Sequence, residues 1–104
     1  MSHARSNAGH VPGAPTVRAY FLVTAPADPQ LLPRLIEPVA KLGTTPLRVH
    51  ASREDGDGRE LSVDLRLAGV SARTAELVEF ALRAVVGVSQ VTAHIEPEAI
   101  EKVA

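Results

Sequence analysis

The spacing of hydrophobic positions changes repeatedly between residues 17 and 96. Alternation over 17–24 predicts a strand, and helical spacing over 31–42 predicts a helix after the turn 26–29. Alternating segments follow at 47–52 and 61–67, and Gly69 is expected to end the second of them. Ser71 is a predicted N-cap for a second helical pattern, which Gly87 is expected to end, and a last strand follows over 90–95. This order is the ferredoxin-like βαββαβ pattern. We expect an α+β sandwich: a four-stranded antiparallel sheet with two helices on one face.

Turn chemistry places the ends of the first helix. Asp28 is a candidate N-cap, and Pro29 suits a first helical position. A helix that starts near residues 30–31 puts Pro33 in its first turn, where no N–H donor is needed. Pro38 lies deeper and predicts a kink or a loosened turn, and Gly43 is expected to end the helix.

Length and composition predict one small domain. The chain has 104 residues, of which 45% are hydrophobic and only three are aromatic, so the core must be aliphatic. We expect a disordered arm over 1–16, the folded domain over 17–96 and a tail over 97–104. A core this small is marginal alone, so an oligomer is expected.

Charge and residue usage exclude several function classes. The net charge of −1 gives no electrostatic footprint for nucleic acid, and no apolar run is long enough for a membrane span. Residues 1–16 lack the apolar stretch of a secretory leader, so a soluble cytoplasmic protein is expected. There is no cysteine, and neither the histidines at 3 and 10 nor the acidic loop at 55–57 has the spacing of a metal site. We expect no metal and no cofactor.

The face of the sheet away from the helices is predicted to be polar. Exposure to water alone explains such a face, and a docking surface for a partner is the alternative. Only one aromatic lies on it, which disfavours base stacking of the kind that RNA-binding modules use. His50 and His94 fall on opposite edge strands, too far apart to form a catalytic pair. The chain also has no nucleophile elbow and no phosphate loop, so a binding protein is favoured over an enzyme. The residues expected on this face are Arg18, Tyr20, Arg48, His50, Asp64, Arg66, Thr92 and His94.

Three short motifs carry a family resemblance. They are Ala27-Asp28-Pro29-Gln30-Leu31-Leu32, Arg34-Leu35-Ile36 and Lys41-Leu42-Gly43-Thr44-Thr45. With these motifs the segment 18–96 resembles an ACT domain, a small regulatory module that often binds amino acids. Within that family it looks most like the small regulatory subunit of acetolactate synthase, which has a similar Arg-hydrophobic-Ile helix and a Val-x-x-Val entry to the last strand, here Val88-Ser89-Gln90-Val91.

The resemblance implies a ligand at a dimer interface, between the first turn of one chain and the start of the second strand of its neighbour. A helix N-terminus suits a carboxylate because its N–H groups are unpaired. The N–H groups of residues 30 and 31 are the expected donors, although Gln30 stands where many relatives have glycine. Capping alone is another explanation for the acidic turn. The implied site residues are Asp28, Gln30, Leu31, Thr44 and Thr45.

Two functions remain open from the sequence. The first is a regulatory subunit or partner module of an amino-acid biosynthetic enzyme, such as the acetolactate synthase large subunit. The second is a stand-alone sensor with an amino-acid effector at its dimer interface. In both, we expect a homodimer formed by pairing of the second strand, because an edge strand offers free N–H and C=O groups. The expected interface residues are Leu47, Arg48, Val49 and His50.

Overall fold

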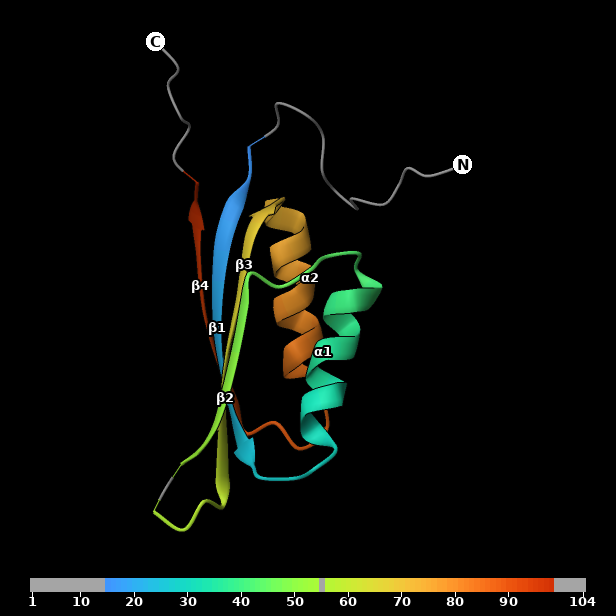
Figure 1. Ribbon diagram of the computed structural model, residues 1–104. Helices are drawn as coiled ribbons and strands as arrows, with labels where there is room; N and C mark the ends of the chain where they lie inside the picture. Colours follow the sequence, from blue (N-terminus) through green and yellow to red (C-terminus); the bar gives the residue numbers. More distant parts are fainter. Residues whose placement is uncertain (1–14, 55, 99–104) are drawn as a thin grey trace.

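The computed structural model describes residues 15–54 and 56–98, and it confirms the predicted fold. A single antiparallel sheet of strand order β2-β3-β1-β4 carries both helices on one side, as Figure 1 shows. The elements are β1 (Val17–Pro26), α1 (Leu31–Lys41), β2 (Arg48–Glu54), β3 (Glu60–Val70), α2 (Ala72–Arg83) and β4 (Gln90–Pro97).

Strand β1 lies at the centre, paired with β3 on one side and with β4 on the other. Its side chains alternate between buried and accessible along its whole length. Phe21, the one fully buried aromatic, lies opposite Leu65 of β3 and Ala93 of β4. The core between the sheet and the helices is aliphatic around this ring, as the composition predicts. Its fully buried large side chains are Phe21, Leu35, Leu65, Leu67, Leu82, Val23, Val39, Val63 and Val78.

Helix α1 begins at Leu31, the late start that accommodates Pro33 in the first turn. Its buried stripe is Leu31, Leu35 and Val39, at helical spacing. The helix runs without a break past Pro38, whose carbonyl accepts from Leu42 N at 3.1 Å. Gly43 follows with φ 76°, which confirms the predicted end of the helix.

The N-cap of α2 is confirmed, and two predicted boundaries are wrong. Ser71 Oγ accepts from Thr74 N at 3.0 Å. The helix ends at Arg83, before the predicted stop at Gly87. Gly69 does not end β3: with φ 70° it lies in a β-bulge, where β3 has one residue more than β1, and pairing resumes at Val70.

Strand β2 differs most from the expectation. The alternation of residues 47–51 predicts that Leu47, Val49 and Ala51 point inward. They do lie on the helix side of the sheet, but Leu47 is 59% and Val49 41% exposed, and Ala51 is exposed too. The core includes residues of β1, β3 and β4 but none of β2, so neither helix covers this strand. An apolar edge is therefore left open to solvent beside α1.

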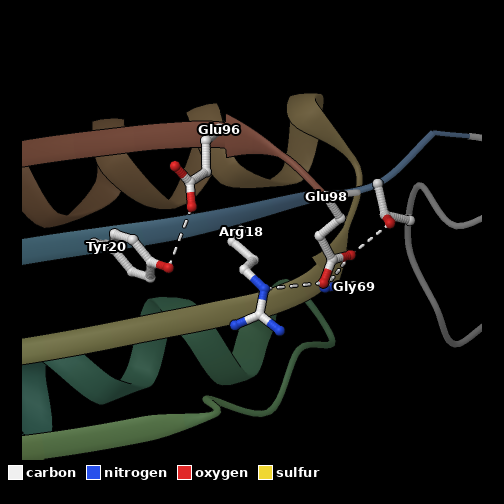
Figure 2. A network of polar contacts seen from close by, with 6 residues as sticks. Arg18, Tyr20, Gly69, Glu96 and Glu98 are labelled. Atoms are coloured by element: carbon white, nitrogen blue, oxygen red, sulfur yellow. Dashed lines mark hydrogen bonds and ion pairs between the residues drawn. The ribbon is translucent and has the colours of Figure 1, made fainter. Parts of the chain in front are cut away.

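Glu98 connects the end of β4 to the start of β1 and to the bulge in β3 (Figure 2). Its Oε1 accepts from Thr16 Oγ1 at 2.6 Å and from Gly69 N at 3.2 Å, and its Oε2 lies 3.5 Å from Arg18 Nε. The backbone of Glu98 also donates to Thr16 O at 3.0 Å. Thr16, which the sequence assigns to the arm, thus contacts the domain. One carboxylate secures the bulge and both ends of the described chain.

We expect Glu98→Ala to lower the free energy of unfolding by about 1–2 kcal/mol, because the N–H of Gly69 and the hydroxyl of Thr16 lose their acceptor. Glu98→Gln keeps an accepting oxygen and loses only the exposed ion pair, so about 0.5 kcal/mol or less is expected. Urea unfolding measures both. Equal stability of the two variants would contradict this role for the carboxylate.

Candidate functional site

A cavity of about 380 Å³ opens where the turn between β1 and α1 meets the β2–β3 hairpin. The turn is held against the hairpin by Ala27 N, which donates to Arg59 O at 2.7 Å. Two charged side chains and an apolar surface share the lining. The lining residues are Ala27, Asp28, Pro29, Leu32, Arg53 and Leu61.

Asp28 organises the turn on the helix side of this cavity. Its Oδ1 accepts from Gln30 N at 2.9 Å, and its backbone carbonyl accepts from Leu31 N at 3.0 Å. This is an Asx turn that leads into the helix. Asp28 therefore does not take the predicted N-cap position, which Gln30 occupies without a side-chain cap. Both N–H groups expected to bind a carboxylate already have an acceptor in Asp28.

Arg53 contributes the positive charge on the opposite side of the cavity. It lies near the end of β2, opposite Leu61 of β3, which in turn lies opposite Ala25 of β1. Its Nε donates to Gly58 O at 2.8 Å, and Gly58 has φ 74°. A Cβ at Gly58 would come within 3.2 Å of Arg53 Nη2, so glycine gives this guanidinium its place. The hairpin loop thereby positions a cation at the cavity.

The structure brings only part of the predicted site together. Asp28 lines the cavity, whereas Leu31 is buried in the core and Gln30 accepts a long hydrogen bond, 3.5 Å, from Arg34. Thr44 and Thr45 follow the C-terminal end of α1, about 16 Å along the helix from its start. They could approach a cavity of this kind only from a second chain, as the resemblance implies. The sequence reasoning missed Arg53 and Leu61, which the strands β2 and β3 bring to the cavity.

The open face of the sheet carries the residues predicted for it, arranged in rows across the strands. One row joins Arg48, Arg66, Tyr20 and His94, and the next joins His50, Asp64, Leu22 and Thr92. A shallow hollow of about 340 Å³ lies between the two rows. His50 and His94 lie on opposite edge strands, as predicted.

Tyr20 is enclosed by its neighbours on this face. Arg66 lies 5.2 Å over the ring, and His94 stacks on it at 5.9 Å between centroids. The two side chains come from the strands on either side of β1, Arg66 from β3 and His94 from β4. The hydroxyl donates to Glu96 Oε2 at 3.3 Å (Figure 2).

Asp64 and Arg66 form a bidentate pair on the same face, with N–O distances of 3.0 and 3.1 Å. The hydrogen bond from Arg66 lowers the pKa of Asp64. Partial burial opposes the shift, and the charges of Arg66, Arg48 and His50 add to it. The pair anchors the guanidinium that covers Tyr20.

Two negative findings concern the described residues. In 15–54 and 56–98 no three His, Cys, Asp or Glu side chains gather where they could hold a metal ion. Neither helix in these ranges has the length and apolar character needed to cross a membrane.

We expect the free energy of unfolding of Asp64→Asn to fall less than that of wild type as the pH is lowered. The folded pKa lies below the unfolded value of about 3.9, so the ionised carboxylate stabilises the fold above that pH and loses this effect as the pH falls through the folded pKa. Wild type and variant should differ most near neutrality and converge as the pH falls below the folded pKa. Arg66→Gln should weaken the dependence of the free energy of unfolding on pH over the same acid range. Parallel curves from urea unfolding at each pH would contradict the assignment.

Comparison with solved structures agrees with the fold described above. The crystal structure of the ACT domain from GTP pyrophosphokinase of Chlorobium tepidum has a TM-score of 0.64 at 14% identity, covering 76% of this chain and 99% of that chain. The solution structure of the same domain has a TM-score of 0.60 at 14% sequence identity, and the match covers 74% of this chain and 84% of that chain. The structure of an uncharacterized protein from Thermotoga maritima has a TM-score of 0.56 at 11% sequence identity, and the match covers 77% of this chain and 94% of that chain. At these identities the likeness concerns the fold.

No curated protein sequence matches the chain. The profile of the ACT-like domain family matches residues 13–99, which include every helix and strand of the structure. Membership supports a regulatory, ligand-binding role. With most of its length matched, the chain belongs to the ACT-like domain family.

Proposed function

We propose that this chain is a non-catalytic regulatory module that binds a small α-amino acid in the cavity between the β1–α1 turn and the β2–β3 hairpin. The observation that carries the proposal is the pair of opposite charges on that cavity, Asp28 from the turn and Arg53 from the hairpin. An amino acid presents an ammonium and a carboxylate on one carbon. A site with one acid and one guanidinium matches both groups.

The residues that line the cavity have different roles in the proposed binding. Only Oδ1 of Asp28 is engaged within the described residues, so its second oxygen is available to accept from an ammonium. Arg53 uses Nε to bind Gly58 O, which leaves its terminal nitrogens to donate to a carboxylate. Pro29, Leu32 and Leu61 form an apolar surface for an aliphatic side chain. Valine, leucine and isoleucine are therefore the first ligands to test.

The volume is consistent with this ligand class. Small-molecule sites occupy about 300–1,000 Å³ and combine an apolar lining with a few placed polar groups. The cavity, at about 380 Å³, falls at the lower end of that range. Its mouth lies beside the exposed strand β2, so a second chain could close it. This agrees with the interface ligand that the family resemblance implies.

Isothermal titration with valine, leucine, isoleucine, serine and phenylalanine at millimolar concentration tests the proposal. We expect binding of an aliphatic amino acid. Asp28→Asn, which keeps the Asx turn, and Arg53→Gln should each weaken binding about tenfold or more, because each removes a charge-assisted contact.

Arg59→Gln is the matched control, since Arg59 pairs with Asp57 at the hairpin and does not line the cavity. It should bind as wild type does. Silence with all five amino acids, or equal weakening by Arg59→Gln, would refute the site.

A second candidate is a regulatory subunit of an amino-acid biosynthetic enzyme, with the acetolactate synthase large subunit as the first partner to test. The observation in its favour is an apolar patch on the helix layer, where Phe80 is 74% and Val86 80% exposed. Beside it lies a groove of about 290 Å³ between α1 and α2, in which the apolar residues Pro38, Ala81, Ala84 and Val85 face the charged residues Arg34, Glu37 and Lys41 of α1. Exposed apolar patches of this kind mark protein–protein contacts.

We expect a purified acetolactate synthase large subunit to retain the wild-type chain in a pull-down, and Phe80→Asp to abolish retention. Phe80 is solvent-exposed, so the variant should keep the wild-type circular dichroism spectrum and melting curve. Glu76→Gln, one turn earlier on an exposed position of α2, is the control. No retention of the wild-type chain, or retention of Phe80→Asp, would exclude this partner through this patch.

A further inference from the structure

The charges on the open face of the sheet are separated along β2 and β3. Arg48 lies opposite Arg66 at one end of the paired strands, and Glu54 lies opposite Glu60 at the other end. About 20 Å of extended strand separates the two ends. This distance exceeds the Debye length of about 8–10 Å, so the acidic end has little effect on the field at the basic end. An anion is therefore attracted to one end of this face.

The two arginines at the basic end are unfavourable for the strand pair itself. Side chains directly opposite one another have Cβ atoms about 4.5–5.5 Å apart, and like charges in that position are destabilising. Within the described residues, Arg48 and the neighbouring His50 are exposed and have no hydrogen bond and no ion pair. The contacts in this part of the chain thus give Arg48 no structural role.

Arg66 is already fixed in one orientation. Its Nε and Nη2 donate to the two oxygens of Asp64 at 3.0 and 3.1 Å, and its guanidinium carbon lies 5.2 Å from the centre of the Tyr20 ring. The remaining nitrogen, Nη1, has no partner in 15–54 and 56–98. Both oxygens of Asp64 face Arg66. A guanidinium held in this way loses little conformational entropy when a ligand binds.

A hollow of about 340 Å³ begins beside the same guanidinium. Arg66 of β3, Leu22 of β1 and Thr92 of β4 are among the residues that line it. Leu22 lies opposite Asp64 and Thr92, and its side chain is 44% exposed. Exposure to water does not explain an apolar side chain at the centre of a polar face. The hollow therefore offers apolar contact next to a positive charge.

We propose that this face binds a small organic phosphate, with its phosphoryl group between Arg48 and Arg66 and its organic part over Leu22. A phosphate monoester carries a charge of about −1.5 to −2 at pH 7 and has three acceptor oxygens. Arg48, Nη1 of Arg66 and the imidazole of His50 supply a donor for each oxygen. A carboxylate has two oxygens and one charge, so it uses fewer of these donors.

This site is separate from the amino-acid cavity. Arg53 and Leu61 line that cavity from the helix side of the sheet, whereas Arg48 and Arg66 project from the open face. The phosphate site therefore goes beyond the function proposed above and does not depend on it.

Nuclear magnetic resonance of the full chain tests the site, with inorganic phosphate and phenyl phosphate as the two probes. Sodium chloride holds the ionic strength constant, and no amino acid is present. We expect saturable shifts of the backbone amides at Arg48, His50 and Arg66 with both probes at millimolar concentration. Phenyl phosphate should bind about fivefold more tightly, because its ring covers the apolar surface of Leu22. Shifts that do not saturate, or that sodium chloride alone reproduces, would overturn the proposal.

Three variants separate the parts of the site. Arg48→Gln should weaken binding of both probes about tenfold or more, because it removes a charge-assisted contact. Arg73→Gln is the control, since it changes the net charge equally at an exposed position of α2, and it should bind as wild type does. Leu22→Thr should lose the preference for phenyl phosphate and keep the wild-type affinity for inorganic phosphate.

Equal weakening by Arg48→Gln and Arg73→Gln would refute the site. A preference for phenyl phosphate that survives Leu22→Thr would contradict the placement of the organic part. Asp28 and Arg53 are unchanged in all three variants, so none of these results bears on amino-acid binding.

Urea unfolding without phosphate distinguishes a ligand site from a structural role. Arg48→Gln removes a like-charge contact with Arg66, so its midpoint should lie at or above that of wild type. A lower midpoint would show that Arg48 stabilises the sheet and would count against the proposal.

Sedimentation with vesicles distinguishes a soluble phosphate from a lipid headgroup. We expect the chain to stay in solution with phosphatidylcholine vesicles, whether or not they contain phosphatidic acid. Sedimentation with the phosphatidic acid vesicles, combined with no shift from phenyl phosphate, would assign the arginines to a membrane surface and overturn the proposal.

Discussion

Two-sided pairing of β1 is the constraint on which the rest of this domain depends. With β3 on one side and β4 on the other, each residue of β1 is committed to one face by strict alternation. Phe21 and its neighbours two residues away enter the core, and Tyr20 and Leu22 lie on the open face. A slip of one residue would exchange the two sets. The register of β1 therefore defines the core and the open face together.

Much of the fold follows from local pattern in the sequence. Alternation identifies β1 and β3, and Ser71 marks the start of α2 because its hydroxyl satisfies a specific N–H group. Strand β2 shows the limit of this reasoning. Leu47 and Val49 alternate as core residues do, yet no helix covers them. Periodicity reports which face of a strand is apolar, but whether another element packs on that face depends on where α1 lies.

Only the turn between β1 and α1, one of the two segments that form the candidate site, could be predicted from the sequence. Asp28 stands in a local acidic-proline turn, which the sequence makes visible. Arg53 reaches the same cavity through pairing of β2 with β3 and of β3 with β1. Such a juxtaposition depends on register between segments far apart in the chain, and local spacing does not encode it. The guanidinium is also positioned by Gly58, whose role becomes clear only from the contact between them.

The enclosed position of Tyr20 has an optical consequence. The chain has one tyrosine and no tryptophan, so its near-ultraviolet fluorescence arises almost entirely from this one ring. That ring lies beside a guanidinium and an imidazole, and its hydroxyl is bonded to a carboxylate. A phenol in such contacts emits differently from one in water. The domain thus contains a built-in fluorophore at the centre of its open face, which reports on that surface without any label.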